Sequence, residues 1–298
     1  MSNRGLAILI SSAALLAGCT QGVPDPHGPI ASGERQILFN SLGIMLAIVI
    51  PTIIATLGVA YWFRASNARA TYLPNFVYSG RLELLVWSIP AMTVLLVGGV
   101  AWVGAHRLDP RTPIPSASAP LQVQVVSLDW KWLFIYPEQG VASINQLTLP
   151  VDTPVSFELT SSSVMNSFFV PQLGSQIYTM SGMATHLWLE ADEPGTYPGL
   201  SANFSGDGFA DMRFDVNVIS AAAFEQWVSA TRASGPVLDA PAYADLAKPS
   251  HTVAPSTYRS VASGLFNQIL HAPTSAAEPT GLTRAEPPAG SASQRARE

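Results

Sequence analysis

Residues 37–63, ILFNSLGIMLAIVIPTIIATLGVAYWF, form an apolar stretch that contains no Asp, Glu, Lys or Arg. At a rise of about 1.5 Å per residue, a helix of this length can cross a hydrocarbon core about 30 Å thick. A second stretch, LLVWSIPAMTVLLVGGVAWVGA at residues 84–105, has the same property and follows Glu83 directly. We therefore predict two transmembrane helices, at residues 37–63 and 83–105.

The segment between these helices, residues 64–82, is rich in arginine and contains no acidic residue. Because positively charged loops stay on the cytoplasmic side of the membrane, we expect this loop in the cytoplasm and both chain ends on the outer side. Pro51 and Pro90 lie inside the two stretches. Proline leaves helix carbonyls unpaired, so its presence here indicates packing against further membrane helices.

The N-terminus has the pattern of a bacterial lipoprotein signal peptide over residues 1–18. Arg4 precedes a short apolar run that ends in Leu16, Ala17, Gly18 and Cys19. The run is too short to span a bilayer but fits an export signal. Small residues before a cysteine at this place form a lipobox, so we expect cleavage before Cys19 and lipidation of its thiol. Residues 19–36 are then a periplasmic segment.

The composition excludes several classes of protein. The chain has 298 residues, of which 48% are hydrophobic and 12% charged, with a formal net charge of -5. The charged fraction is about half of that in an average soluble domain, which argues against an ordinary cytosolic enzyme. There is no basic excess to bind nucleic acid. A single cysteine excludes intrachain disulfides and metal sites built from several thiolates.

After the second helix, the sequence changes to a linker rich in Pro, Ser and Ala at residues 106–120. Apolar and polar residues then alternate between turn signals, which predicts a β-sandwich or barrel over residues 121–219. Residues 220–271 show helical spacing of apolar residues and are predicted to form short helices. Residues 272–298 contain few large apolar residues and are predicted to be disordered.

Three segments of the outer domain resemble subunit II of the haem-copper respiratory oxidases. They are WKWLFIYPEQG at 130–140, SVMNSFFVP at 163–171, and the region from Tyr197 to Met212. The resemblance extends from Cys19 to about Leu270. It implies a membrane-anchored all-β protein, in which two N-terminal transmembrane helices precede a periplasmic cupredoxin-like domain and short C-terminal helices follow it.

The resemblance also assigns a set of copper-ligand positions, and most of them are changed here. In the cytochrome c oxidase branch, two cysteines, two histidines, a methionine and a backbone carbonyl hold a dinuclear copper centre. The corresponding positions in this chain are Asn166, Ser201, Asn203, Ser205 and Phe209, and only Met212 is retained. Serine hydroxyls cannot bridge copper ions as thiolates do, and phenylalanine has no lone pair. The five histidines, at positions 27, 106, 186, 251 and 271, show no metal-ligand spacing. We expect this chain to bind no metal.

A copper-free subunit II resembles the ubiquinol oxidases of the bo and ba types. This likeness implies a proton-pumping complex in the bacterial inner membrane that oxidises ubiquinol and reduces O2 to water. Haems and copper are expected in subunit I, and no cofactor is expected in this chain, which is a structural and assembly subunit. The implied partners are subunits I, III and IV and membrane lipid, without cytochrome c.

Three further residues are assigned candidate roles. The family has a glutamate at the position of Glu83 near a proton pathway, so Glu83 is a candidate for proton uptake; the alternative is an acid that stabilises a helix N-terminus. Trp130 matches the aromatic residue through which cytochrome c donates electrons in the copper-bearing branch. Without copper, we expect Trp130 and Trp132 to form an aromatic platform against subunit I.

Two alternative functions are compatible with the sequence. The chain could be a stand-alone membrane-anchored binding or scaffold lipoprotein with a copper-free cupredoxin fold, although the prolines of its helices indicate partners. It could also be a cytochrome c oxidase subunit with a different copper site, although few metal ligands are present to build one.

Overall fold

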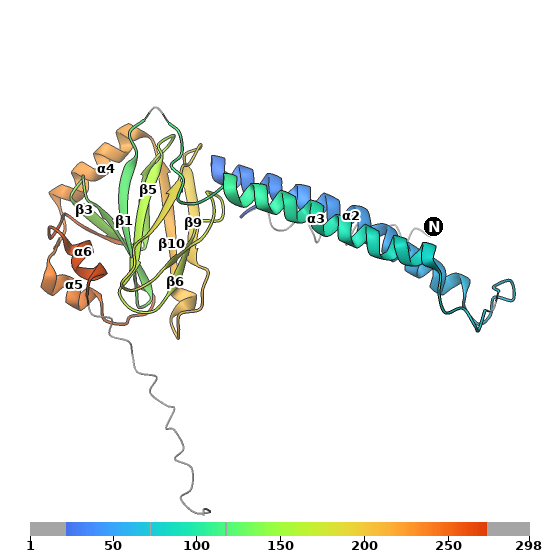
Figure 1. Cartoon of the computed structure of the whole chain (residues 1–298). Helices are drawn as coiled ribbons and strands as arrows, with labels where there is room; N and C mark the ends of the chain where they lie inside the picture. The colour runs from blue at the N-terminus through green and yellow to red at the C-terminus, as the bar shows by residue number, and fades with distance from the viewer. Residues whose placement is uncertain (1–21, 72, 117, 273–298) are drawn as a thin grey trace, which may run out of the picture.

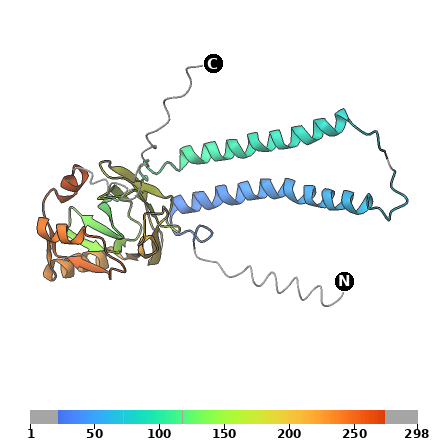
Figure 2. The same cartoon turned by 90° about the horizontal axis from the view of Figure 1, so that it is seen from below.

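Two long helices, α2 (Pro29–Trp62) and α3 (Gly80–Arg107), run side by side from one end of a β domain (Figures 1 and 2). The computed structural model describes residues 22–71, 73–116 and 118–272. The predicted signal peptide, Cys19 and nearly all of the predicted disordered tail lie outside these residues. Both helices are long and apolar enough to span a membrane. The predicted order of two apolar helices followed by a β domain is confirmed.

The first helix begins earlier than the apolar pattern predicted. Residues 29–36 belong to α2, whereas the sequence placed them in a periplasmic segment before the helix. Gly28 has an extended backbone and Pro29 occupies the first helical position, where its missing N–H costs no hydrogen bond. The helix start is therefore set by Pro29 rather than by the beginning of the uncharged stretch. The second helix likewise includes residues at each end of the predicted span, from Gly80 to Arg107.

The β domain consists of two sheets packed face to face. The larger sheet has the strand order β12-β3-β2-β1-β5-β8, and the smaller sheet has the order β4-β10-β9-β6-β7. The strands of the larger sheet are β1 (Leu121–Leu128), β2 (Lys131–Tyr136), β3 (Val141–Ile144), β5 (Val155–Ser161), β8 (Thr185–Leu189) and β12 (Ser256–Tyr258). Those of the smaller sheet are β4 (Gln146–Pro150), β6 (Asn166–Phe169), β7 (Ile177–Thr179), β9 (Gly195–Ser201) and β10 (Arg213–Ile219). The pairs β1–β5 and β4–β10 are parallel, which gives the mixed sheets of a cupredoxin-like sandwich.

Aromatic side chains fill the space between the sheets. The rings of Phe168 and Phe214 stack with centroids 5.2 Å apart, and the Trp132 ring meets each of them at an edge. A Cβ atom at Gly199 would lie 2.1 Å from the Phe214 ring, so only glycine fits at this point of β9. The alternation of apolar residues along β1, β5 and β10 reflects this buried face.

The C-terminal region contains helices α4 (Ala221–Ala233), α5 (Ala240–Leu246) and α6 (Leu265–Leu270), which cover one side of the domain (Figure 1). It also contains strands that the sequence did not predict. The strands β11 (Val237–Leu238) and β13 (Ser260–Val261) pair with each other, and β12 extends the larger sheet beside β3. These strands have two or three residues each and are too short to produce a recognisable alternation.

Residues 22–28 lie against the β domain before α2 begins, and we call them the strap. The backbone N–H of His27 donates to the carbonyl of Gln172 at 2.8 Å, and His27 accepts from the N–H of Asp192 at 3.0 Å. A Cβ atom at Gly28 would lie 2.2 Å from the carbonyl oxygen of Glu190, so the two backbones approach too closely for any other residue. The strap therefore fixes the start of α2 to the outer domain.

Candidate functional site

The residues at the expected copper-ligand positions lie on two neighbouring connections at one end of the smaller sheet. Asn166 begins β6, Ser201 ends the adjacent strand β9, and the others lie in the β9–β10 connection. The hydroxyl of Ser201 lies 3.2 Å from Asn166 Oδ1 and 3.2 Å from the carbonyl of Asn203, and it accepts from the N–H of Ser167 at 3.4 Å. We call this arrangement the serine cluster. Asn166 and Ser201 are buried, and these contacts compensate for their burial.

The rest of the β9–β10 connection is held by a second set of contacts. A short 3-10 helix, η2 (Phe209–Asp211), turns the chain so that Met212 is buried. The hydroxyl of Ser205 donates to the sulfur of Met212 at 3.4 Å. The ring of Phe209 packs on that of Phe204 with centroids 5.6 Å apart. The residues at the six expected ligand positions therefore form three sets of contacts. Asn166, Ser201 and Asn203 share hydrogen bonds, Ser205 contacts Met212, and Phe209 packs on Phe204.

The donor atoms of these residues do not fit a dinuclear copper centre. They are hydroxyl, amide and carbonyl oxygens and one thioether, and they include no thiolate and no imidazole. The lone pairs of Ser201 and Asn166 are used in hydrogen bonds within the cluster. Over the part of the chain that the structure describes, no group of three or more His, Cys, Asp or Glu residues could hold a metal ion.

Sequence comparisons show which known proteins this chain is similar to. Residues 139–219 match the family described as "Cytochrome C oxidase subunit II, periplasmic domain", and residues 232–272 match the "COX Aromatic Rich Motif". Cytochrome bo(3) ubiquinol oxidase subunit 2 from Pseudomonas aeruginosa is 46% identical over 88% of this chain and 79% of its own length. Ubiquinol oxidase subunit 2 from Acetobacter aceti is 47% identical over 88% of this chain and 85% of its own length.

The chain belongs to the ubiquinol oxidase subunit 2 family. Among solved structures, the periplasmic domain of subunit II of cytochrome oxidase (CoxB) from Bradyrhizobium japonicum covers 38% of this chain and 94% of that chain. Its identity to this chain is 22% and its TM-score is 0.36.

Trp130 and Trp132 have different surroundings. Trp132 is fully buried and contacts the aromatic core, so the predicted role of Trp132 in a platform against another subunit is wrong. The reason is the alternation of β2, which directs its side chain between the sheets. Trp130 precedes the strand, has a positive φ of 90° and is half-buried. Its indole N–H donates to the carbonyl of Ser205 at 3.2 Å.

The aromatic-rich motif covers Trp130 with a contact that the sequence did not reveal. The His251 ring stacks on Trp130 with centroids 4.7 Å apart, and its Nδ1 lies 3.4 Å from a carboxylate oxygen of Asp211. Trp130 also packs so closely on Gly208 that an added Cβ would lie 2.4 Å from the ring. The motif is therefore attached to the same connection that carries Ser205 and Phe209.

A buried lysine provides a further attachment of the motif. Lys131 is 2% exposed, and its ammonium donates to the carbonyl of Lys248 at 2.8 Å, to that of Asp129 at 3.2 Å, and to the hydroxyl of Ser250. Burial lowers the pKa of Lys131, and the negative charge of Asp129 opposes this effect. Its neighbours in the sequence gave no signal of this role, because Lys248 is 117 positions away.

A group of acidic residues surrounds the strap at the end of the domain that joins α2. The two ring nitrogens of His27 lie 3.4 Å from Asp25 and 3.3 Å from Glu193. Burial raises the pKa of Glu190, as do the charges of Asp192 and Asp152. The sequence showed His27 only as a histidine without metal-ligand spacing, because apart from Asp25 the acidic residues around it come from distant turns.

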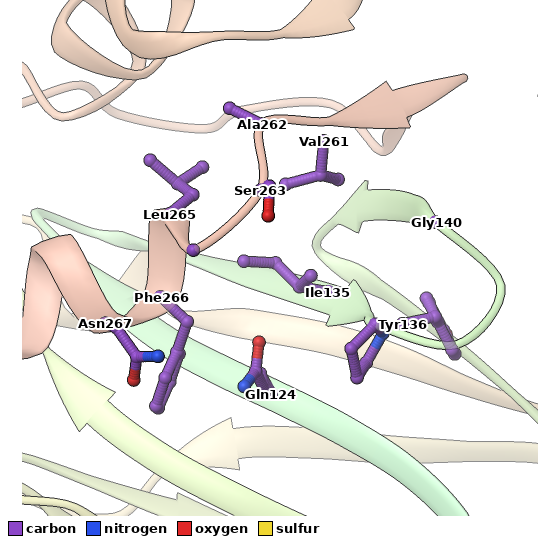
Figure 3. A pocket seen from close by; sticks show the side chains of 12 residues that line it. Gln124, Ile135, Tyr136, Gly140, Val261, Ala262, Ser263, Leu265, Phe266 and Asn267 are labelled. Atoms are coloured by element: carbon purple, nitrogen blue, oxygen red, sulfur yellow. The ribbon is translucent and has the colours of Figure 1, made fainter.

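The aromatic-rich motif also encloses a pocket of about 240 Å³ on the opposite face of the larger sheet from the aromatic core (Figure 3). Ile135, Phe266 and Asn267 line it, together with Gln124, whose amide donates to the carboxylate of Glu158 at 3.2 Å. The pocket is lined by no Asp, Glu, Lys, Arg or His side chain, so we assign it no catalytic role.

Glu83 lies in the first turn of α3, at the end of the helix pair farthest from the β domain, and it is exposed in the isolated chain. A carboxylate in this turn faces the positive end of the helix dipole. The position is compatible both with a proton-uptake role and with helix stabilisation.

Proposed function

We propose that this chain is subunit II of a proton-pumping ubiquinol oxidase, which oxidises ubiquinol and reduces O2 to water. The observation that carries the proposal is the serine cluster: a domain of the cytochrome c oxidase subunit II family has oxygen donors and a phenylalanine where copper ligands are expected. The most similar relatives cited above have names that specify ubiquinol oxidase.

The missing copper ligands fit the chemistry of the proposed electron donor. Cytochrome c is a soluble one-electron carrier and needs a relay in the periplasmic domain. Ubiquinol carries two electrons and is dissolved in the bilayer, so it can reduce a haem in another subunit without such a relay. In this proposal, haems and copper are bound by subunit I, and this chain binds none of them.

The proposed role of the chain is to support and assemble the complex with subunits I, III and IV. Most apolar side chains of α2 and α3 are exposed in the isolated chain, as expected for helices that meet lipid or other membrane helices. Near the serine cluster, Phe204 is 74% exposed, and Met165 is also exposed. A hydrogen bond joins the two segments that carry these side chains: the amide of Asn203 donates to the carbonyl of Met165 at 3.3 Å. We assign this apolar surface to contact with subunit I.

The proposed location is the bacterial inner membrane. The arginine-rich loop between α2 and α3 faces the cytoplasm, and the β domain lies in the periplasm. A lipid on Cys19 then anchors the N-terminus to the outer leaflet.

One purification tests the proposal against both alternatives. The chain is extracted from membranes with a mild detergent, and co-purifying haem, O2 consumption with ubiquinol or reduced cytochrome c, and visible absorption are measured. We expect haem-bearing subunits, activity with ubiquinol only, and no thiolate-to-copper charge-transfer band. A monomer without haem would support the scaffold alternative, and such a band with cytochrome c activity would support the copper-bearing one.

A further inference from the structure

A groove of about 570 Å³ lies between the outer ends of α2 and α3, near their junction with the β domain. The helices touch at its outer part, where Ile37 packs so closely on Gly104 that an added Cβ would lie 2.4 Å from it. Farther from the domain, Gly99 also lines the groove, but a Cβ there would have no atom within 4 Å. The side chains of this chain therefore leave space above Gly99.

The polarity of the groove changes along its length. Arg107 and Gln36 line the part nearest the domain, Asn40 and Val100 line the middle, and Leu95 and Leu96 line the part toward the membrane interior. Because the two helices run in opposite directions and Ile37 meets Gly104, Gln36 lies near the outer end and Asn40 about one helical turn deeper. A cationic group, two amides and an apolar channel thus follow one another with depth.

The length of the groove matches one leaflet of a bilayer. From Leu95 to Arg107, α3 rises about 18 Å, and half of a hydrocarbon core is about 15 Å thick. Arg107 is the last residue of α3. In helices that span the membrane, it lies at the level of the outer headgroups. It forms no ion pair with a carboxylate within the described residues.

We propose that this groove binds one phospholipid of the outer leaflet. The phosphate pairs with the guanidinium of Arg107, the glycerol ester carbonyls accept hydrogen bonds from the amides of Gln36 and Asn40, and an acyl chain lies over Gly99 against Leu95 and Leu96. The positive charge of Arg107 complements the phosphate, and guanidinium binds phosphate with two parallel hydrogen bonds. If a purely apolar transmembrane helix filled the groove instead, the amides of Gln36 and Asn40 would be buried in the membrane without hydrogen-bond partners.

Photo-crosslinking tests this site in the complete complex. The complex that contains the full chain is reconstituted in vesicles of phosphatidylethanolamine and phosphatidylglycerol, with a trace of phosphatidylglycerol that carries a photoreactive group on its acyl chain. After irradiation, labelled peptides are identified by mass spectrometry. We expect labels within residues 95–103 of the unmodified chain.

Two matched pairs of variants distinguish a specific site from general lipid contact. Gly99→Leu fills the open space in the groove, whereas Gly98→Leu adds the same side chain at a neighbouring open position outside the groove lining. Arg107→Gln removes the cation from the groove, whereas Arg111→Gln removes one beyond the helix end. We expect a several-fold loss of label in Gly99→Leu and Arg107→Gln and none in the two controls.

Absence of label in the unmodified chain would overturn the proposal, because it would mean that a helix of another subunit or the acyl chains on Cys19 fill the groove. Equal labelling within each pair would overturn it as well. Arg107→Gln changes an exposed side chain at the end of α3, so it keeps the test valid if Gly99→Leu prevents assembly. The readout does not depend on oxidase activity, so failure of this proposal is distinguishable from failure of the proposed function.

Discussion

At the residue scale, single side chains determine which donor atoms stand at the expected copper-ligand positions and which contacts stabilise the outer domain. Ser201 satisfies its hydroxyl within the protein, through Asn166, Asn203 and the Ser167 N–H. A lone cysteine at this position would not restore a copper centre, because Ser205, Phe209 and Asn166 would still lack thiolate and imidazole donors. The departure from the donor set expected of a copper centre is therefore distributed over several side chains.

Trp132 is expected to be the residue whose truncation most weakens the aromatic core. Trp132→Ala removes a fully buried ring that contacts Phe168 and Phe214, so it should cost about 3–5 kcal/mol of unfolding free energy. Trp132→Phe should cost less, since the indole N–H has no hydrogen-bond partner within the described residues. Thermal unfolding of the full chain in detergent, followed by near-UV circular dichroism, measures both. Trp102→Ala on the exposed face of α3 is the control, and an equal effect there would contradict the assignment.

Glu83 is expected to affect turnover through its carboxylate. If Glu83 takes up protons for the complex, Glu83→Ala and Glu83→Gln should lower ubiquinol-driven O2 consumption several-fold, and Glu83→Asp should preserve it. Glu225→Gln on α4 is an exposed acidic control outside the helix pair. Unchanged turnover in all three Glu83 variants would leave only the helix-stabilising role.

At the scale of elements, the strap is the segment whose docking is most sensitive to charge. Its His27 contacts Asp25 and Glu193, and Glu190, Asp192 and Asp152 lie close by. Burial raises the pKa of Asp192, and the charges of Asp152 and Glu193 add to this effect while His27 opposes it. Repulsion among these carboxylates therefore acts against a contact that fixes the start of α2.

Glu190→Gln is expected to stabilise this junction in a pH-dependent way. A carboxyl group whose pKa is raised by folding binds its proton more tightly in the folded chain, so its stabilising effect is present at low pH and is lost as pH rises through the raised pKa. Above that pH, the variant should melt at a higher temperature than the unmodified chain. The difference should vanish as pH falls below the ordinary value of 4.5.

Melting curves of the full chain at a series of pH values check this expectation. Glu138→Gln, at an exposed turn of the domain, is the matched control. A variant that melts at the same temperature as the unmodified chain at neutral pH would show that the acidic group does not oppose docking of the strap.

At the scale of the whole molecule, the proposed topology places the two ends of the helix pair on opposite sides of the membrane. The chain has one cysteine, which we expect to be blocked by lipid, so new cysteines report their own location. In intact cells, a membrane-impermeant maleimide should label Ser229→Cys on exposed α4 and should not label Ser66→Cys in the exposed loop after α2. Disruption of the inner membrane should make both reactive. Labelling of Ser66→Cys in intact cells would reverse the orientation.

The sequence by itself determined the properties that depend on composition and on residue chemistry. Uncharged stretches predicted α2 and α3, and period-two alternation predicted a β-sandwich or barrel, because both signals are local. The presence of Ser201, Ser205 and Phe209 where the resemblance expects thiolate and imidazole donors predicted that no copper centre forms, and this prediction needed no coordinates.

The tertiary structure decided the properties that depend on contacts between distant residues. It buried Trp132 in the core, joined Lys131 to Lys248 across 117 positions, and placed Gln172 beside Asp25 across 147 positions. It also left the space above Gly99 open between two helices. Such contacts follow from how the elements pack. The sequence around one residue does not predict which distant residue the packing will bring into contact with it.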